Sequence, residues 1–182
     1  MSDPLYIFAA LTPWLAILCY YDCRFRRLPN LLTIGGMLIA LVWRFGIDGF
    51  PSLCGGLTGG LFSGLFLLLP FYLRAAGGGD VKMLVAAGCA LGFGRVAHLL
   101  LATSVAGIVL AIFMLVSGFA SGKRLIHYFR CLLDWRYDRK LGRESLPPKS
   151  DERSRIPFGV AIAVGVWTTL LWEITLKSGA VS

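Results

Sequence analysis

Residues 96–122 read VAHLLLATSVAGIVLAIFMLVSGFASG, a stretch without a single Asp, Glu, Lys or Arg. A helix needs roughly 20 mostly apolar residues to cross the hydrocarbon core of a bilayer, and this stretch is long enough. Five more uncharged runs cover residues 4–21, 28–43, 49–73, 83–94 and 156–172. We read the six runs as six transmembrane helices and expect an all-α polytopic membrane protein. For the short run 83–94, a re-entrant or interfacial segment is the alternative.

The composition of the whole chain agrees with this interpretation. Of its 182 residues, 57% are hydrophobic and only 15% are charged, a balance with too little polar surface for a water-soluble domain of this size. The first residues, MSDPLY, lack the basic segment that opens a cleavable signal peptide, so we expect the first run to be a transmembrane helix of the mature protein. We expect residues 1–182 to form a single transmembrane domain.

The basic residues predict how the spans are oriented. With six spans, the first, third and fifth connections share one side of the membrane with each other, and both termini share the opposite side. All Lys and Arg residues except Arg44, Arg95 and Lys177 fall in or beside the odd-numbered connections. Positive residues favour the cytoplasmic side, so we expect those connections in the cytoplasm and both termini on the non-cytoplasmic side.

The largest group of basic residues lies at about 123–155, in the predicted fifth connection. This basic loop is expected to face the anionic lipids of the cytoplasmic leaflet, which attract each Lys or Arg by roughly 1 kcal/mol. The formal net charge of +8 is therefore explained without a nucleic-acid partner. Leu125, Phe129 and Leu132 have helical spacing within the loop and predict an interfacial helix, with docking to a protein partner as the alternative.

Two acidic residues lie at span ends on the predicted cytoplasmic side. Asp22 stands where the first run ends, in YYDCRFRRLPN (20–30), and Asp80 stands where the fourth begins, in GGGDVKM (77–83). Ionisable groups at membrane depth usually face a cavity or a partner, so both are candidate functional residues. The alternative is that each carboxylate only pairs with a neighbouring basic residue at the headgroup level.

Three consecutive glycines precede the second aspartate. Gly77, Gly78 and Gly79 would allow backbone conformations that are closed to other residues, and would let another segment approach closely. We expect this run to shape the site around Asp80.

A pair of neighbouring carboxylates has a well-defined chemistry. The two cannot both ionise freely, so one holds a proton while the other is anionic, and together they can activate water for attack on an amide. Other chemistries fit less well: His98 and His127 are predicted on opposite sides of the membrane, and the five cysteines form no CxxC pair. We expect no metal site and no cofactor.

Three stretches resemble the type IV prepilin peptidases, intramembrane aspartyl proteases of the GxGD class. Residues 77–83 are similar to that family's GxGDxK motif, with Met83 where leucine is common. Residues 22–30, DCRFRRLPN, look like its first-aspartate motif, with Leu28 in place of isoleucine. Residues 155–162, RIPFGVAI, resemble the IP-x-G-x-AI element that opens the family's last helix.

The resemblance implies an activity and a set of site residues. Its catalytic pair would be Asp22 and Asp80, and the substrate a prepilin whose leader is cut off after a glycine at the cytoplasmic face of a bacterial inner membrane. Further residues of the three motifs would shape the site or bind substrate: Gly77, Gly78, Gly79, Lys82, Pro29, Asn30, Pro157 and Gly159.

One departure from the family separates two of its forms. Bifunctional members carry an N-terminal cytosolic segment with paired CxxC motifs, which is associated with N-methylation of the new pilin terminus. This sequence has no CxxC and begins almost at its first span. It resembles the short, peptidase-only members linked to Flp pili and tight adherence, and N-methyltransferase activity is not expected.

Two non-enzymatic functions remain as alternatives to a peptidase. In a small transporter or channel, Asp22 and Asp80 would bind a cation or relay protons. The many glycines of the middle spans agree with this function, and equally with close packing of helices through small residues. In a scaffold subunit of a secretion machine, both aspartates would be replaceable.

Overall fold

The chain is a bundle of α-helices. The computed structural model describes residues 4–25, 28–72, 76–117 and 158–179, and within these ranges it has no strand. The helices are α1 (Pro4–Phe25), α2 (Asn30–Tyr72), α3 (Gly78–Leu91), α4 (Phe93–Val116) and α7 (Phe158–Gly179). Of these, α1, α2, α4 and α7 are long and apolar enough to cross a membrane. An all-α, multi-pass membrane protein is therefore confirmed.

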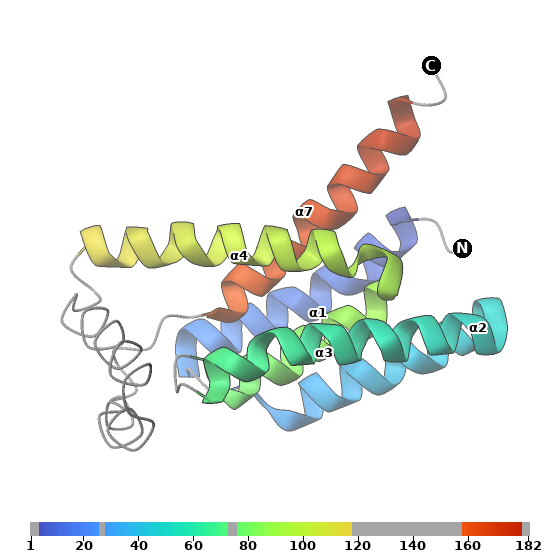
Figure 1. Ribbon diagram of the computed structural model, residues 1–182, viewed down its shortest axis with the longest axis horizontal. Helices are drawn as coiled ribbons and strands as arrows, with labels where there is room; N and C mark the ends of the chain where they lie inside the picture. The colour runs from blue at the N-terminus through green and yellow to red at the C-terminus, as the bar shows by residue number, and fades with distance from the viewer. Residues whose placement is uncertain (1–3, 26–27, 73–75, 118–157, 180–182) are drawn as a thin grey trace, which may run out of the picture.

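The 43 residues of α2 cover two of the predicted spans. A straight helix of that length would measure about 65 Å, twice the hydrocarbon thickness of a bilayer. The backbone leaves the helical conformation at Gly49, where φ is 68° and ψ is −154°, values that only glycine adopts readily. Figure 1 shows the chain turning back there, so that the two halves of α2 run antiparallel.

The short fourth run forms α3, an inner helix of the bundle. Its 14 residues span about 21 Å, less than the roughly 30 Å of a hydrocarbon core. Every residue from 86 to 91 is buried, and the helix packs against α2, α4 and α7. Because α3 is so short, six complete spans remain a prediction.

Small residues bring α3 close to the second half of α2. A Cβ on Gly59 would lie 2.5 Å from the carbonyl oxygen of Gly88, and a Cβ on Gly88 would lie 2.6 Å from the carbonyl oxygen of Gly59. A Cβ on Gly60 would meet the side-chain sulfur of Cys89. Because Gly59 and Gly88 have no Cβ, the two backbones touch, which is how small residues stabilise helix pairs in membranes.

The helices alternate in direction along the bundle. In Figure 1 the C-terminal ends of α1 and α4 and the N-terminal ends of α2, α3 and α7 point to the left. The two chain ends and the reversal within α2 lie to the right. The arrangement has the alternation that the uncharged runs predict, and the side of the membrane that each end faces remains a prediction.

Some predictions fall on parts of the chain that lie outside the described residues. These are the basic loop at 123–155 with its interfacial helix, and Pro157 of the third motif.

Candidate functional site

Asp22 lies near the C-terminal end of α1 and is buried, with 6% of its surface exposed. The backbone N–H of Gly159, in the first turn of α7, donates a hydrogen bond of 2.8 Å to Asp22 Oδ2. The unpaired N–H groups in a first turn carry partial positive charge, which stabilises a carboxylate there. The fold therefore holds the first aspartate by the N-terminus of another helix.

Asp80 occupies the first turn of α3 and is half-buried. Its Oδ2 accepts a hydrogen bond of 3.0 Å from the backbone N–H of Gly77, the residue that caps the helix. This contact is one half of a capping box; Gly77 has no side chain to supply the other half. The carboxylate thus helps to start the helix that carries it.

The three glycines before Asp80 differ from the prediction in their backbone conformation. None of Gly77, Gly78 and Gly79 has a positive φ; among the described glycines, only Gly49 and Gly92 do. The expectation that this run adopts glycine-only conformations was wrong, because the chain enters α3 through extended backbone at Gly77. The expectation of a close approach is confirmed at Gly79, where a Cβ would lie 3.1 Å from Leu28 Cβ.

Contacts join the three motifs into one site. Leu28, just after α1, packs on Gly79, and Lys82 Nζ donates a hydrogen bond of 2.8 Å to Asn30 Oδ1. The first motif therefore touches the second at two points and the third through Asp22 and Gly159. The carbonyl oxygen of Pro29, in the same motif, accepts hydrogen bonds from the N–H groups of residues 32 and 33 and so begins α2.

Contacts with α4 fix the first turn of α7, which carries Gly159. The ring of Phe158 fills the space that a side chain on Gly107 would need, since a Cβ there would lie 2.9 Å from Phe158 Cε2. Further along the same helix pair, Gly165 lies against Thr103. These contacts hold the first turn of α7 in place, together with the Gly159 N–H group that donates a hydrogen bond to Asp22.

Two arginines at the other end of the bundle have roles that the sequence did not reveal. Arg44, on the first half of α2, donates to the carbonyl oxygens of Ser52 at 2.9 Å and Ala90 at 3.2 Å. Ala90 is in the last turn of α3, where carbonyl groups have no partner within the helix. Arg44 thus satisfies a helix end in addition to flanking a span.

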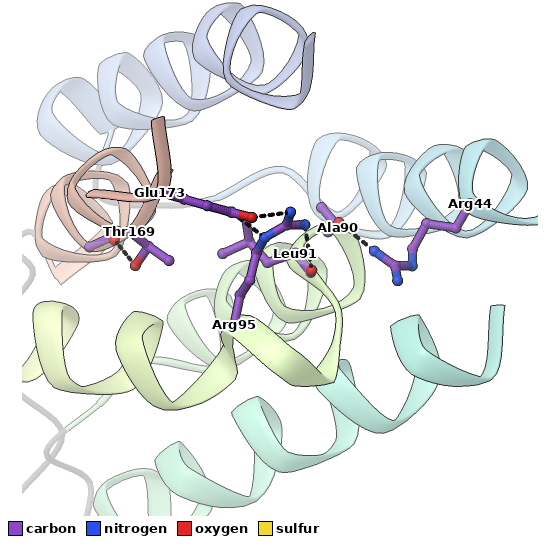
Figure 2. Close-up of polar contacts among 7 residues, drawn as sticks. Arg44, Ala90, Leu91, Arg95, Thr169 and Glu173 are labelled. Carbon is purple, nitrogen blue, oxygen red and sulfur yellow. Dashed lines mark hydrogen bonds and ion pairs between the residues drawn. The ribbon is translucent and has the colours of Figure 1, made fainter. Parts of the chain in front are cut away.

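Arg95, near the start of α4, forms an ion pair with Glu173 of α7. Its Nε and Nη2 atoms lie 2.5 and 2.7 Å from the two carboxylate oxygens, and its Nη1 donates to the Leu91 carbonyl at 3.3 Å (Figure 2). The side chain of Glu173 is only 22% exposed and accepts two hydrogen bonds from Arg95, so it is more than an acid that flanks a span. A charged residue at the edge of an apolar run was the only signal in the sequence.

The arrangement suits acid–base chemistry at one end of the bundle. The helix ends that carry Asp22 and Asp80 point the same way, and each carboxylate accepts a hydrogen bond from a backbone N–H at a helix start. Within the described ranges, no group of three or more His, Cys, Asp or Glu residues is placed to hold a metal ion.

Comparison with known proteins gives one match. The model of the type IV leader peptidase family matches residues 9–112, a segment that contains both aspartates and ends before the third motif. No curated protein and no solved structure matches the chain significantly.

Proposed function

The chain belongs to the type IV leader peptidase family, and we propose that it is an intramembrane aspartyl endopeptidase whose catalytic pair is Asp22 and Asp80. The observation that carries the proposal is the contact of the first motif with the other two, through Gly159 with Asp22, Lys82 with Asn30 and Leu28 with Gly79. A transporter has no comparable support from the family match.

Hydrolysis by this pair follows from two carboxyl groups that share one proton. The anionic carboxylate takes a proton from water as the water oxygen attacks the amide carbonyl carbon, and the protonated carboxyl group gives its proton to the carbonyl oxygen. The C–N bond of the tetrahedral intermediate then breaks as the proton taken from water passes to the departing nitrogen, and one hydroxyl of the intermediate returns its proton to the other carboxylate as the C=O bond re-forms. The products are a leader with a new carboxyl terminus and a protein with a new amino terminus.

We propose a prepilin of the Flp type as the substrate, cut after a glycine at the cytoplasmic face of a bacterial inner membrane. A peptide bond within an intact helix is shielded by the helix's own hydrogen bonds, and opening a helix costs least where water can satisfy the freed groups. Glycine has little preference for helix, so a glycine at this boundary favours the extended form. Carboxylates at the ends of α1 and α3 suit a bond at that depth.

The direct test is leader removal in cells. A candidate Flp-type prepilin is co-expressed with wild type, Asp22→Asn or Asp80→Asn in a host without prepilin peptidases, and is followed by gel shift and N-terminal sequencing. We expect wild type to cut after the leader glycine, and each variant to accumulate in the membrane with at least ~100-fold less cleavage.

Asp48→Asn is the matched control, because Asp48 is an acid next to the reversal of α2, at the opposite end of the bundle. It should cleave like wild type. Cleavage by Asp22→Asn or Asp80→Asn would remove that residue from the catalytic pair. A wild type that cuts no prepilin would overturn the peptidase proposal, and ion flux through reconstituted protein would then be the next measurement.

A further inference from the structure

The ion pair between Arg95 and Glu173 lies far from the aspartates but on the helices that hold them. Asp80 is in the first turn of α3, and Leu91, whose carbonyl Arg95 contacts, is its last residue. Gly159, which binds Asp22, is in the first turn of α7, and Glu173 is on the same helix about 21 Å further along. The guanidinium group of Arg95 therefore links the end of α3 that is far from Asp80 to a part of α7 that is far from Gly159.

The geometry of this contact is that of a rigid fixing point. Both carboxylate oxygens of Glu173 are bound by different nitrogens of Arg95, the paired arrangement that fixes direction as well as distance (Figure 2). The two side chains are only 13% and 22% exposed, so neither charge is fully solvated by water. Breaking the pair would leave two poorly solvated charges without a partner, so the contact is expected to persist.

The other contacts of α3 do not fix it to α7 in the same way. Glycines bring α3 into close backbone contact with the second half of α2. The packing of α3 on α7 is much less extensive than its packing on α2. The corner between α3 and α4, at Gly92, is instead anchored to α7 by Arg95.

We infer that Arg95 and Glu173 are a positioning pair, which sets the place of α3 relative to α7 and so the place of Asp80 relative to Asp22. The inference rests on the proposed function, since it assigns the pair to the alignment of two catalytic carboxylates. Neither residue touches the substrate. Their effect on the reaction is through geometry alone.

The test compares kcat and KM with stability in purified full-length protein. Wild type, Glu173→Gln, Arg95→Lys and the double variant Arg95→Gln/Glu173→Gln are reconstituted in lipid, with a purified Flp-type prepilin that wild type cleaves as substrate. The double variant leaves no unpaired charge, which protects the comparison against simple misfolding. Arg44→Gln is the matched control, because it removes the other arginine that binds the last turn of α3, and the hydrogen bonds of this arginine to Ser52 and Ala90 link α3 to α2 and not to α7.

We expect kcat to fall about 10–100-fold in the Arg95 and Glu173 variants, the loss that a misplacement near 1 Å causes, while KM stays close to wild type. Arg44→Gln should lower the unfolding temperature but keep most of kcat. Three results would overturn the inference: a double variant with wild-type kcat, an equal loss of kcat in Arg44→Gln, or Arg95 and Glu173 variants that fail to fold, which would make the pair structural only. A wild type that cleaves no prepilin refutes the proposed function first, before any variant is compared.

Discussion

A methyl group added to Gly159 would stand 2.6 Å from Oδ2 of Asp22. The same residue supplies the N–H group that this carboxylate accepts. The contact with Asp22 therefore depends both on the small size of Gly159 and on its backbone N–H group. A larger residue would have to displace either the carboxylate or the first turn of α7.

We therefore predict that Gly159→Ala lowers the kcat of prepilin cleavage by about 10–100-fold, because the added methyl group moves Asp22 out of alignment. The measurement is the rate of cleavage by purified protein at saturating prepilin. Gly179→Ala is the control on the same helix, since a Cβ there meets nothing within 4 Å. Equal activity of the two variants would mean that Gly159 has no part in positioning the aspartate.

Glycines also show how far single residues can be interpreted from sequence. Three glycines in succession, Gly77, Gly78 and Gly79, predict an unusual backbone conformation. Among the glycines that the structure describes, the conformations that only glycine adopts readily are instead at Gly49 and Gly92, both isolated from that run and both at chain reversals. A run of glycines indicates only that the backbone is free to adopt many conformations. A positive φ is imposed where the chain has to reverse its direction.

At the scale of elements, the pair formed by α2 and α3 depends on backbone contact. The atoms nearest to a Cβ on Gly59 are the Gly88 oxygen at 2.5 Å, the Gly92 carbon at 2.9 Å and the Phe93 nitrogen at 3.0 Å. All three belong to the backbone and cannot turn aside like the end of a side chain. Extra volume at this point must separate the helices.

Gly59→Ala is predicted to destabilise the protein by about 1–3 kcal/mol, the usual cost of overpacking. Gly46→Ala should instead be neutral or stabilising by about 0.4–1 kcal/mol, since it lies in the same helix with open space around its Cβ and loses only unfolded-state freedom. Unfolding of both variants in detergent micelles measures the difference. If Gly59→Ala were as stable as Gly46→Ala, the two helices would not be in close contact in the membrane.

The elements themselves could largely be predicted from the sequence. Uncharged runs located α1, α4 and α7, and the charged residues 44 and 48 separated the two halves of α2. The partners of charged residues could not be predicted. Arg95 and Glu173 are 78 residues apart, and the sequence around one gives no indication that it pairs with the other. Pairing of this kind is decided by how helices pack, which composition does not specify.

For the whole molecule, the candidate site residues were easier to find in the sequence than the contacts that hold them. The two aspartates and Gly159 stand in motifs that resemble a known family, and parity of the spans placed both acids at one end. The bond between Gly159 and Asp22 joins residues 137 positions apart and arises from the packing of α7 on α1 and α4. The family match supports the chemistry, and only the fold explains which contacts hold it in place.

Orientation in the membrane is the property of the whole molecule that the proposed reaction requires. The basic residues predict that the end of the bundle with Asp22 faces the cytoplasm, where a prepilin leader is found. We test it in a variant without the five native cysteines by introducing Arg24→Cys, beside Asp22, or Phe50→Cys, at the reversal of α2; both positions are exposed.

A membrane-impermeant maleimide should label Phe50→Cys in intact spheroplasts, and Arg24→Cys only after the membrane is permeabilised. The reason is that the two positions lie at opposite ends of the bundle, and only the first half of α2 separates them along the chain. Labelling of Arg24→Cys from outside would place both aspartates on the non-cytoplasmic face. A cytoplasmic leader could not then reach them, and the substrate would have to be a bond exposed on the outer side of the membrane.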